Sequence, residues 1–207
     1  MGITTLFWDM GGVVLTNGWG HSSRRVAADT FGLDAADFEE RHHAVFPAWE
    51  AGESTLDLYL ERTVFYRARS FSKSEFADFM YQQSQPLPGG LELLSSLSST
   101  YRCVMLNNEP REINQYRLDR FQLRPHFAVF CCSCFVRLRK PDPHIYALAL
   151  NLVQRSPEEC LFLDDRSVNL EGAAALGIQT LQAKDPAQLR RDLQTRGIQS
   201  ADVPLAV

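Results

Sequence analysis

The apolar run Leu6-Phe7-Trp8 leads into Asp9, and Gly11-Gly12 follows shortly after it. A short apolar run that ends at glycines indicates a buried strand entering a tight turn. Asp9 then lies at the carboxyl end of that strand, which is the edge where open parallel sheets bind ligands. Acidic residues also end strands simply because they favour turns. The run by itself therefore leaves both a functional and a structural role open for Asp9.

Apolar runs recur along the chain, and segments with helical spacing of apolar residues separate most of them. The predicted strands span residues 5–7, 103–106, 127–132, 160–163 and 179–181, and the helices between them span residues 91–97, 112–121, 144–153 and 169–176. Strands that alternate with helices of this length form right-handed crossovers and a parallel sheet. We therefore predict an α/β fold with a doubly wound, Rossmann-like parallel sheet.

Residues 17–87 differ from the rest of the chain because they contain no strand-like run. Helical periodicity covers residues 23–31, 35–46, 55–64 and 74–83, and Gly32, Gly52 and Pro86-Leu87-Pro88-Gly89 punctuate these segments. This pattern predicts a helical cap domain, residues 17–87, inserted after the first strand. The core domain is then residues 1–16 and 88–207.

The charge balance and length restrict the classes of partner. The 207 residues include 21 basic and 25 acidic side chains, a formal net charge of -4, with no block of Lys or Arg. This argues against nucleic acid or an anionic membrane as the main partner. The chain shows no signal peptide and no apolar stretch of the ~18 residues that a membrane span needs, so we expect a cytoplasmic protein. The oligomeric state is not indicated.

Five cysteines, an odd number, include the spacing Cys131-x-x-Cys134. A CxxC pair suggests a metal or redox site, but no second CxxC or nearby His pair completes four ligands. Free cysteine packs as a small apolar residue. Buried thiols without a metal are therefore the favoured interpretation.

Polar residues mark three further junctions between elements. Asn107-Asn108-Glu109-Pro110 follows the second strand, Arg139-Lys140-Pro141 precedes a helix, and Asp164-Asp165 ends the fourth strand. Alone, the first set fits helix capping and the second fits a solvated turn. Two adjacent carboxylates at the end of a buried strand repel each other, and a cation such as Mg²⁺ offsets that repulsion with oxygen ligands.

Together these junctions resemble the haloacid dehalogenase superfamily of phosphohydrolases over nearly the whole chain. Asp9 matches the place of the family's nucleophile, and Asn107 matches its phosphate-binding Ser or Thr. Lys140 lies in the context KPDPxIY, and Asp164 and Asp165 lie in FLDDxxxN. The insertion resembles the helical cap that one large subclass carries between the first two motifs. FWDMGGVV and DDRSVNLEGAAALGI look most like small bacterial phosphatases of sugar phosphates, including glucose-1-phosphate.

The resemblance implies that Asp9 attacks phosphorus and forms an aspartyl phosphate, which water then hydrolyses. It implies Mg²⁺ held by Asp9, the carbonyl oxygen of Gly11 and Asp165. Asp164 would be a further ligand or a group behind the ligands, and Asn169 would orient bound water.

Lys140, Asn107 and Asn108 are implied to bind the phosphate. Lys140 would bridge Asp9 and a phosphate oxygen, while the Asn107 amide and the Asn108 backbone N–H would donate to it. The family usually carries a hydroxyl residue where Asn107 stands. An amide is longer, so it displaces the phosphate or rotates away, which puts activity in doubt more than fold.

Gly11 is the second departure, because the familiar motif has an aspartate there as general acid for the leaving group. General acid catalysis contributes about 100- to 10,000-fold. The chain is therefore predicted either to prefer esters of weakly basic leaving groups or to carry a substitute acid. Glu109 is the first candidate for that acid, and His21, His42 and His43 from the cap are weaker ones.

Because phosphate is common to all candidate substrates, the cap must recognise the remainder of the molecule. The cap residues that could line the cleft are Trp19, His21, Arg24, Trp49, Glu50, Tyr66 and Arg67. Packing within the cap or exposure to solvent is the more common role for each of them.

The leading hypothesis is a magnesium-dependent phosphatase of a small phosphorylated metabolite. One alternative is a catalytically impaired protein of the same fold that binds a phosphorylated ligand or a protein partner, which Gly11 and Asn107 would suit. A second alternative is a metal-independent dehalogenase-like hydrolase. The acid pair argues against the second, because unneutralised carboxylates would repel a haloacid's carboxylate.

Overall fold

The computed structural model describes residues 2–199 and shows one five-stranded sheet with all neighbours parallel, in the order β3-β2-β1-β4-β5. The strands are β1 (Thr5–Trp8), β2 (Arg102–Asn107), β3 (Val129–Cys132), β4 (Cys160–Asp164) and β5 (Gln179–Gln182). The chain builds β2 and β3 on one side of β1 and then crosses to β4 and β5 on the other. This confirms the doubly wound parallel sheet and places the end of β1 at the switch point, where such sheets bind ligands.

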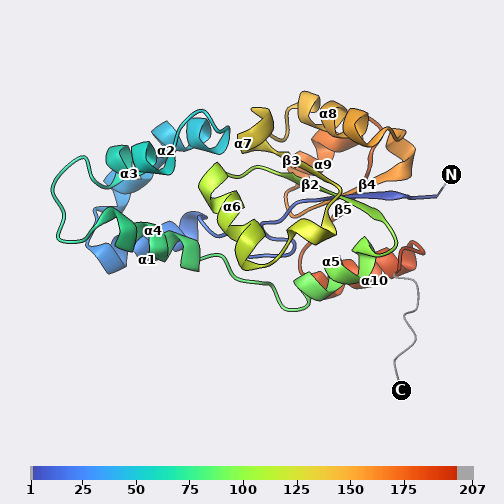
Figure 1. Ribbon diagram of the computed structural model, residues 1–207, viewed down its shortest axis with the longest axis horizontal. Helices are drawn as coiled ribbons and strands as arrows, with labels where there is room; N and C mark the ends of the chain where they lie inside the picture. The colour runs from blue at the N-terminus through green and yellow to red at the C-terminus, as the bar shows by residue number, and fades with distance from the viewer. Residues whose placement is uncertain (1, 200–207) are drawn as a thin grey trace, which may run out of the picture.

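Helices cover both faces of the sheet (Figure 1), and β1 is therefore buried on both faces. Leu6 and Trp8 point into one apolar cluster and Phe7 into the other, as the two-residue period of a strand requires. α5 (Gly90–Ser98) and α10 (Pro186–Thr195) pack on the first cluster, and α8 (Pro143–Val153) and α9 (Ser167–Ala174) pack on the second. The apolar clusters on the two faces hold the strands in place, and with them the polar residues at the strand ends.

Four helices form the insertion between β1 and β2 and project from one side of the sheet (Figure 1). They are α1 (His21–Phe31), α2 (Ala35–Glu50), α3 (Leu56–Thr63) and α4 (Lys73–Gln82). A separate apolar cluster with Trp49, Tyr59 and Phe76 at its centre holds them together. The predicted helical cap is thereby confirmed. α6 (Arg111–Arg120) belongs to the core, yet its Ile113 packs into the cap cluster.

The two chain segments that join cap and core are hydrogen-bonded to each other. The Thr16 backbone N–H donates to the Gln85 carbonyl at 2.8 Å, and its hydroxyl donates to the Gln83 carbonyl at 2.7 Å. Arg117 of α6 donates to the Thr16 carbonyl and to the Ser84 hydroxyl, both at 3.0 Å. We propose that the domains divide at these segments, with 17–87 as the cap and 1–16 and 88–207 as the core, of which residues 1 and 200–207 lie outside the described residues.

All five cysteines are buried and free. Cys131 and Cys132 end β3, and Cys134 lies in α7 (Ser133–Val136). Burial raises the pKa of Cys131 to about 11 and that of Cys134 to about 12, so both thiols are protonated near neutral pH. The predicted buried thiols are confirmed. No helix in the described part of the chain is both long and apolar enough to cross a bilayer.

Candidate active site

Asp9, Asn107 and Asp164 meet at one edge because each ends or directly follows a neighbouring parallel strand. The Asp9 backbone N–H donates to the Leu163 carbonyl of β4 at 2.9 Å, which continues the strand pairing up to the carboxylate. Asn107 is the last residue of β2, and Asp164 is the last residue of β4. All three are buried. Their side chains therefore reach the same small volume from three strands.

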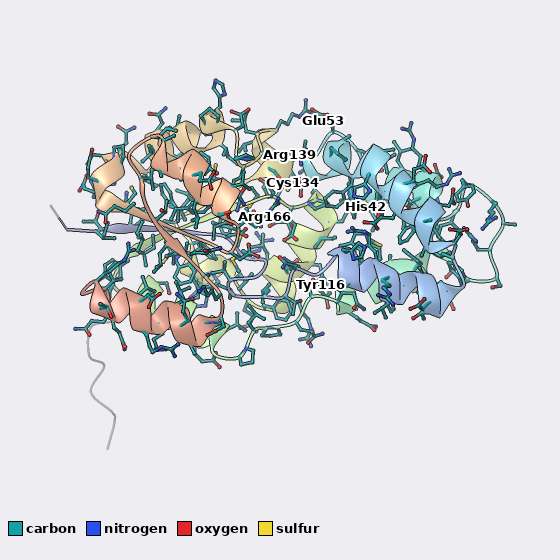
Figure 2. The ribbon with its side chains drawn as sticks, turned by 180° about the vertical axis from the view of Figure 1, so that it is seen from behind. His42, Glu53, Tyr116, Cys134, Arg139 and Arg166 are labelled. Carbon is teal, nitrogen blue, oxygen red and sulfur yellow. The ribbon has the colours of Figure 1, made fainter. Side chains whose placement is uncertain are left out.

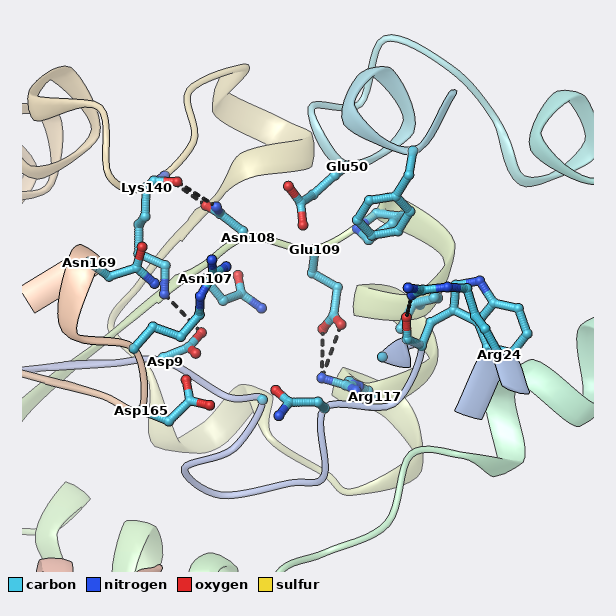
Figure 3. A pocket seen from close by; sticks show the side chains of 18 residues that line it. Asp9, Arg24, Glu50, Asn107, Asn108, Glu109, Arg117, Lys140, Asp165 and Asn169 are labelled. Carbon is cyan, nitrogen blue, oxygen red and sulfur yellow. Dashed lines mark hydrogen bonds and ion pairs between the residues drawn. The ribbon is translucent and has the colours of Figure 1, made fainter. Parts of the chain in front are cut away.

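Lys140 joins two of the carboxylates at this edge, and Figure 3 shows its contact with Asp9. Its Nζ lies 3.0 Å from Oδ1 of Asp9 and 2.6 Å from Oδ2 of Asp164. Asn108 positions the Lys140 backbone, since its Oδ1 accepts from the Lys140 N–H and its Nδ2 donates to the Lys140 carbonyl, each at 2.8 Å. The side chain of Asn108 is thereby used to position Lys140, which leaves its backbone N–H for the predicted contact with phosphate.

Burial raises the pKa of Asp9 to about 7, although the neighbouring Lys140 opposes the shift and Asp164 and Asp165 add to it. Burial alone would lower the pKa of Lys140, but Asp9 and Asp164 raise it overall, so the lysine is a cation. A further cation beside Asp9 would favour the ionised carboxylate, which is the nucleophilic form.

The two adjacent acids differ in their partners. Asp164 is fully buried and accepts from Lys140, from Nδ2 of Asn169 at 3.1 Å and from the backbone N–H of Arg166 at 2.8 Å. Oδ1 of Asp165 is buried without a hydrogen-bond partner among the described residues. A buried carboxylate oxygen without a donor is costly unless a cation binds it.

Asp9, Asp164 and Asp165 each offer an oxygen, and these oxygens lie within 4.8 Å of one another. Oxygen donors grouped in this way suit a hard divalent cation such as Mg²⁺. The unpaired oxygen of Asp165 also indicates a bound divalent cation, whereas Lys140 and Asn169 already engage the oxygens of Asp164. The residues present therefore fit a metal held by Asp9 and Asp165, with Asp164 behind them.

The two glycines after Asp9 bring the chain close to this acid cluster. Gly12 has φ of +74°, and a Cβ there would lie 2.3 Å from Oδ2 of Asp165, so a side chain is excluded on both counts. A Cβ at Gly11 would lie 2.9 Å from Oδ1 of Asn17, and the Asn17 side chain also opposes the rise in the pKa of Asp165 that burial causes. Asn17 therefore fills the space beside the position where the familiar motif has its second aspartate.

Comparison with known proteins identifies the family. Residues 3–177 match the family described as haloacid dehalogenase-like hydrolase. The chain belongs to this family. A HAD family enzyme from Bacteroides thetaiotaomicron in a magnesium complex superposes with a TM-score of 0.80 at 21% identity, over 92% of this chain and 100% of that one. A further structure of that enzyme, in complex with magnesium and inorganic phosphate, has a TM-score of 0.74 at 20% identity, over 87% of this chain and 94% of that one.

Two curated relatives align with part of this HAD-like hydrolase. Bifunctional epoxide hydrolase 2 of Sus scrofa is 36% identical over 107 residues, which are 49% of this chain and 19% of that protein. The phosphorylated carbohydrates phosphatase of Thermotoga maritima is 30% identical over 95 residues, which are 45% of this chain and 44% of that protein. The chain thus spans less than two thirds of the length of the curated relatives that it matches.

A cavity of about 330 Å³ opens between the acid cluster of this HAD-like hydrolase and its cap. The predicted site residues that line it are Asp9, Gly11, Trp19, Asn107, Asn108, Glu109, Lys140 and Asp165. Asp164 lies directly behind Lys140. Trp19 is buried and its Nε1 donates to the Tyr59 hydroxyl at 2.8 Å, so only part of it can face a ligand.

The structure does not bring the three predicted histidines into this cavity. His21 is the exposed first residue of α1 and lines a separate surface hollow. His42 is buried inside the cap, where its Nδ1 lies 2.9 Å from the Tyr59 hydroxyl, and His43 is exposed. A histidine in a helical pattern is placed by the packing of that helix, and sequence spacing did not reveal which face α1 and α2 turn toward the core.

Among the other cap residues considered, Arg24 and Glu50 line the cavity. Arg24 is paired with Glu39, whose oxygens accept from Nε at 2.8 Å and from Nη2 at 2.5 Å. Trp49 is fully buried instead, and Tyr66 donates to Asp37 on the cap surface.

Sequence reasoning missed Arg117 and Asn17, which also line the cavity. Nη1 of Arg117 lies 3.0 Å from Oε1 and 3.1 Å from Oε2 of Glu109, and both side chains are buried. The sequence did contain a sign that Arg117 is buried, because it lies four residues after the apolar Ile113 and therefore on the same face of the helix. Asn17 carried no such signal, since it lies in a loop.

Proposed function

We propose that this HAD-like hydrolase is a magnesium-dependent phosphatase of a small phosphorylated metabolite, with Asp9 as nucleophile. One observation carries the proposal: Lys140 pairs with both Asp9 and Asp164, while Asp165 beside them has a buried oxygen that accepts no hydrogen bond from the described residues. A carboxylate that attacks a phosphoryl group needs such positive charge around it to overcome the repulsion between anions.

Asp9 would attack phosphorus in line, forming a P–O bond to its Oδ while the ester P–O bond breaks, and water would then hydrolyse the aspartyl phosphate. Lys140 would hold a phosphate oxygen next to Asp9 and reduce the charge between them. Asp9, Asp165 and the Gly11 carbonyl would hold Mg²⁺, which would neutralise charge on the phosphoryl oxygens.

Asn107 and the backbone N–H of Asn108 would complete the phosphate site. Nδ2 of Asn107 donates to Oδ1 of Asn114 at 3.3 Å, and Oδ1 of Asn107 is buried without a partner among the described residues. When the side-chain amides of Asn107 and Asn114 are both rotated by half a turn, Asn114 donates to Asn107 instead, so the hydrogen bond between them is kept. The N–H₂ group of Asn107 is then free. That orientation can donate to a phosphate oxygen, which supports Asn107 in the role of the usual hydroxyl residue.

Two relatives support a phosphate ester as the substrate. The Bacteroides enzyme binds magnesium and inorganic phosphate, and the Thermotoga relative is a phosphatase of phosphorylated carbohydrates. A cavity of about 330 Å³ with several polar side chains fits a compact polar group such as a sugar. The group of three acids disfavours a dehalogenase-like reaction, because it would repel a haloacid unless a metal were bound.

The test is a screen of phosphorylated metabolites and para-nitrophenyl phosphate with and without Mg²⁺, beside Asp9→Asn. Turnover that needs both Mg²⁺ and Asp9 is expected. Asp9-dependent dehalogenation of a haloacid without metal would replace the phosphatase by the dehalogenase-like alternative. Binding of phosphate esters without any Asp9-dependent turnover would favour the binding-protein alternative.

A further inference from the structure

A substitute for the leaving-group acid that Gly11 cannot supply has to be a proton donor that lines the cavity. His21 lines another hollow, and burial lowers the pKa of His42 to about 3, which leaves it uncharged and enclosed by the cap. Glu109 lines the cavity, but both its oxygens are held by Arg117 at 3.0 and 3.1 Å. Because Arg117 engages both oxygens, neither is available to a leaving group, although burial raises the pKa of Glu109.

Glu50 is the carboxylate that the cap itself contributes to the cavity. It is the last residue of α2, and Figure 3 shows its side chain reaching from the cap into the space next to Asn108 and Glu109. Nε of Arg139 lies 2.6 Å from Oε2, and Oε1 accepts no hydrogen bond from the described residues. Unlike Glu109, Glu50 therefore keeps one oxygen available to a ligand.

The position of Glu50 depends on the docking of the cap on the core. The Glu50 carbonyl accepts from the Ser133 hydroxyl at 2.7 Å, and Ser133 Oγ also accepts from the Glu109 backbone N–H at 2.9 Å. Gly52 has φ of +72°, and a Cβ there would lie 2.1 Å from the Cys134 carbonyl oxygen. Figure 2 places Cys134 and Arg139 at this junction of core and cap. The end of α2 is thus fixed against α7.

A second contact holds the same part of the cap. Glu112 of α6 accepts from Nε1 of Trp49 at 2.9 Å and from the Leu56 backbone N–H at 2.8 Å. Trp49 precedes Glu50 in the chain and Leu56 follows it, so contacts with the core fix the chain on both sides of Glu50. A catalytic side chain must be held in this way to act with a defined geometry.

The pKa of Glu50 is shifted in the direction that a general acid needs. Burial raises its pKa, and Arg139, Lys140 and Arg166 oppose the shift without cancelling it. A carboxyl group with a raised pKa is suited to donate a proton near neutral pH.

We propose that Glu50 is the general acid for the leaving group, presented to the substrate by the docked cap. This rests on the proposed phosphatase function. As Asp9 forms its bond to phosphorus and the ester bond breaks, the Glu50 carboxyl proton goes to the departing oxygen, which leaves as an alcohol. When water attacks the aspartyl phosphate, the Glu50 carboxylate takes the proton from that water, which restores the acid and releases phosphate.

The experiment compares two esters in Glu50→Gln, which keeps the size of the side chain and removes the transferable proton. Ethyl phosphate has a strongly basic leaving group and needs the acid, whereas para-nitrophenyl phosphate needs it little. The kcat/KM for ethyl phosphate is expected to fall about 100- to 10,000-fold and that for the aryl ester about tenfold or less. Glu53→Gln is the matched control, because Glu53 is exposed nearby on the cap and does not line the cavity.

Retained turnover of the aryl ester also shows that Glu50→Gln folds. An equal loss on both esters, or no loss on either, overturns the role of Glu50 while Asp9-dependent aryl hydrolysis keeps the phosphatase function. A wild-type protein that hydrolyses the aryl ester but not ethyl phosphate likewise overturns it. Absence of Asp9-dependent turnover on every ester removes the phosphatase function and the inference together.

Discussion

Oδ1 of Asn17 lies where it would be 2.9 Å from a Cβ on Gly11. Any side chain at residue 11 must therefore displace the Asn17 amide. The loss of the usual aspartate at Gly11 and the presence of Asn17 form one local packing arrangement, in which an amide occupies the space beside a residue without a side chain.

This contact predicts coupling between substitutions at the two positions. Gly11→Ala is expected to destabilise the protein, and less so in an Asn17→Ala background, with a coupling of about 1 kcal/mol. The measurement is a double-mutant cycle of unfolding free energies from denaturant titration. Additive effects would show that the two residues do not compete for space.

Lys140→Met should remove the cation that Asp9 and Asp164 share. Turnover of an aryl phosphate is expected to fall by about 100- to 1,000-fold or more, because the charge next to the nucleophile is lost. Lys184→Met is the control, since Lys184 is exposed and far along the chain from the site. Steady-state kinetics on both variants makes the comparison. Comparable activities in the two would contradict the assigned role of Lys140.

Asp165→Asn should weaken magnesium binding without unfolding the chain, because Oδ1 of Asp165 accepts no hydrogen bond from residues 2–199 that the substitution would remove. Loss of one charge close to the ion costs about 1 to 4 kcal/mol, which is about tenfold or more in affinity. Magnesium titration calorimetry measures this without an activity assay, and Asp29→Asn on the exposed face of α1 is the control. Unchanged affinity in Asp165→Asn would exclude Asp165 as a ligand.

Arg117→Met should leave Glu109 buried without its cation and release both linkers of the cap. The expected loss of stability is about 3 to 5 kcal/mol, whereas Arg120→Met on the exposed side of α6 should change stability by less than about 0.5 kcal/mol. Glu109→Gln in the Arg117→Met background should recover part of the loss, since a neutral amide replaces the uncompensated carboxylate. Denaturant unfolding checks this, and equal losses in the two arginine variants would contradict it.

The burial of uncharged His42 predicts that the free energy of unfolding decreases in mild acid. Burial lowers its folded-state pKa to about 3 from an ordinary value of 6.5, so unfolding takes up a proton between these values. Stability is therefore highest above pH 6.5 and falls by about 1.4 kcal/mol for each unit below it, until the pH approaches the folded value.

The measurement is the unfolding free energy of wild type and His42→Gln between neutral pH and about pH 5. The variant should lose less stability over this range than the wild type. His21→Gln is the control, because His21 is exposed at the start of α1 and should leave the dependence unchanged. If His42→Gln retains the full acid sensitivity, other groups cause it.

The strands and helices of the core and the inserted cap followed from sequence because their signals are local. A strand such as β1 is recorded in consecutive apolar residues, and the alternation of strands with helices restricts the topology to a parallel sheet. The strand ends then converge by geometry alone, which is why Asp9, Asn107 and Asp164 could be assigned to one site before any contact was known.

Other assignments needed the packed chain. Arg117 binds Glu109, which is eight residues away in the chain, and Thr16, which is 101 residues away, and no sequence periodicity predicts such pairings. Lys140 and Asn169 donate to Asp164 and leave one oxygen of Asp165 without a donor among the described residues. The Asp-Asp sequence alone does not predict which of the two acids is engaged.

The fold, the position of Asp9 and the acid pair thus follow from residues that are neighbours in the chain or that end neighbouring strands. The proposed general acid does not, because the choice between Glu109 and Glu50 rests on the guanidinium of Arg117 and on how the cap packs against α7. Such long-range contacts depend on the packing of whole helices, and only the tertiary structure contains that information.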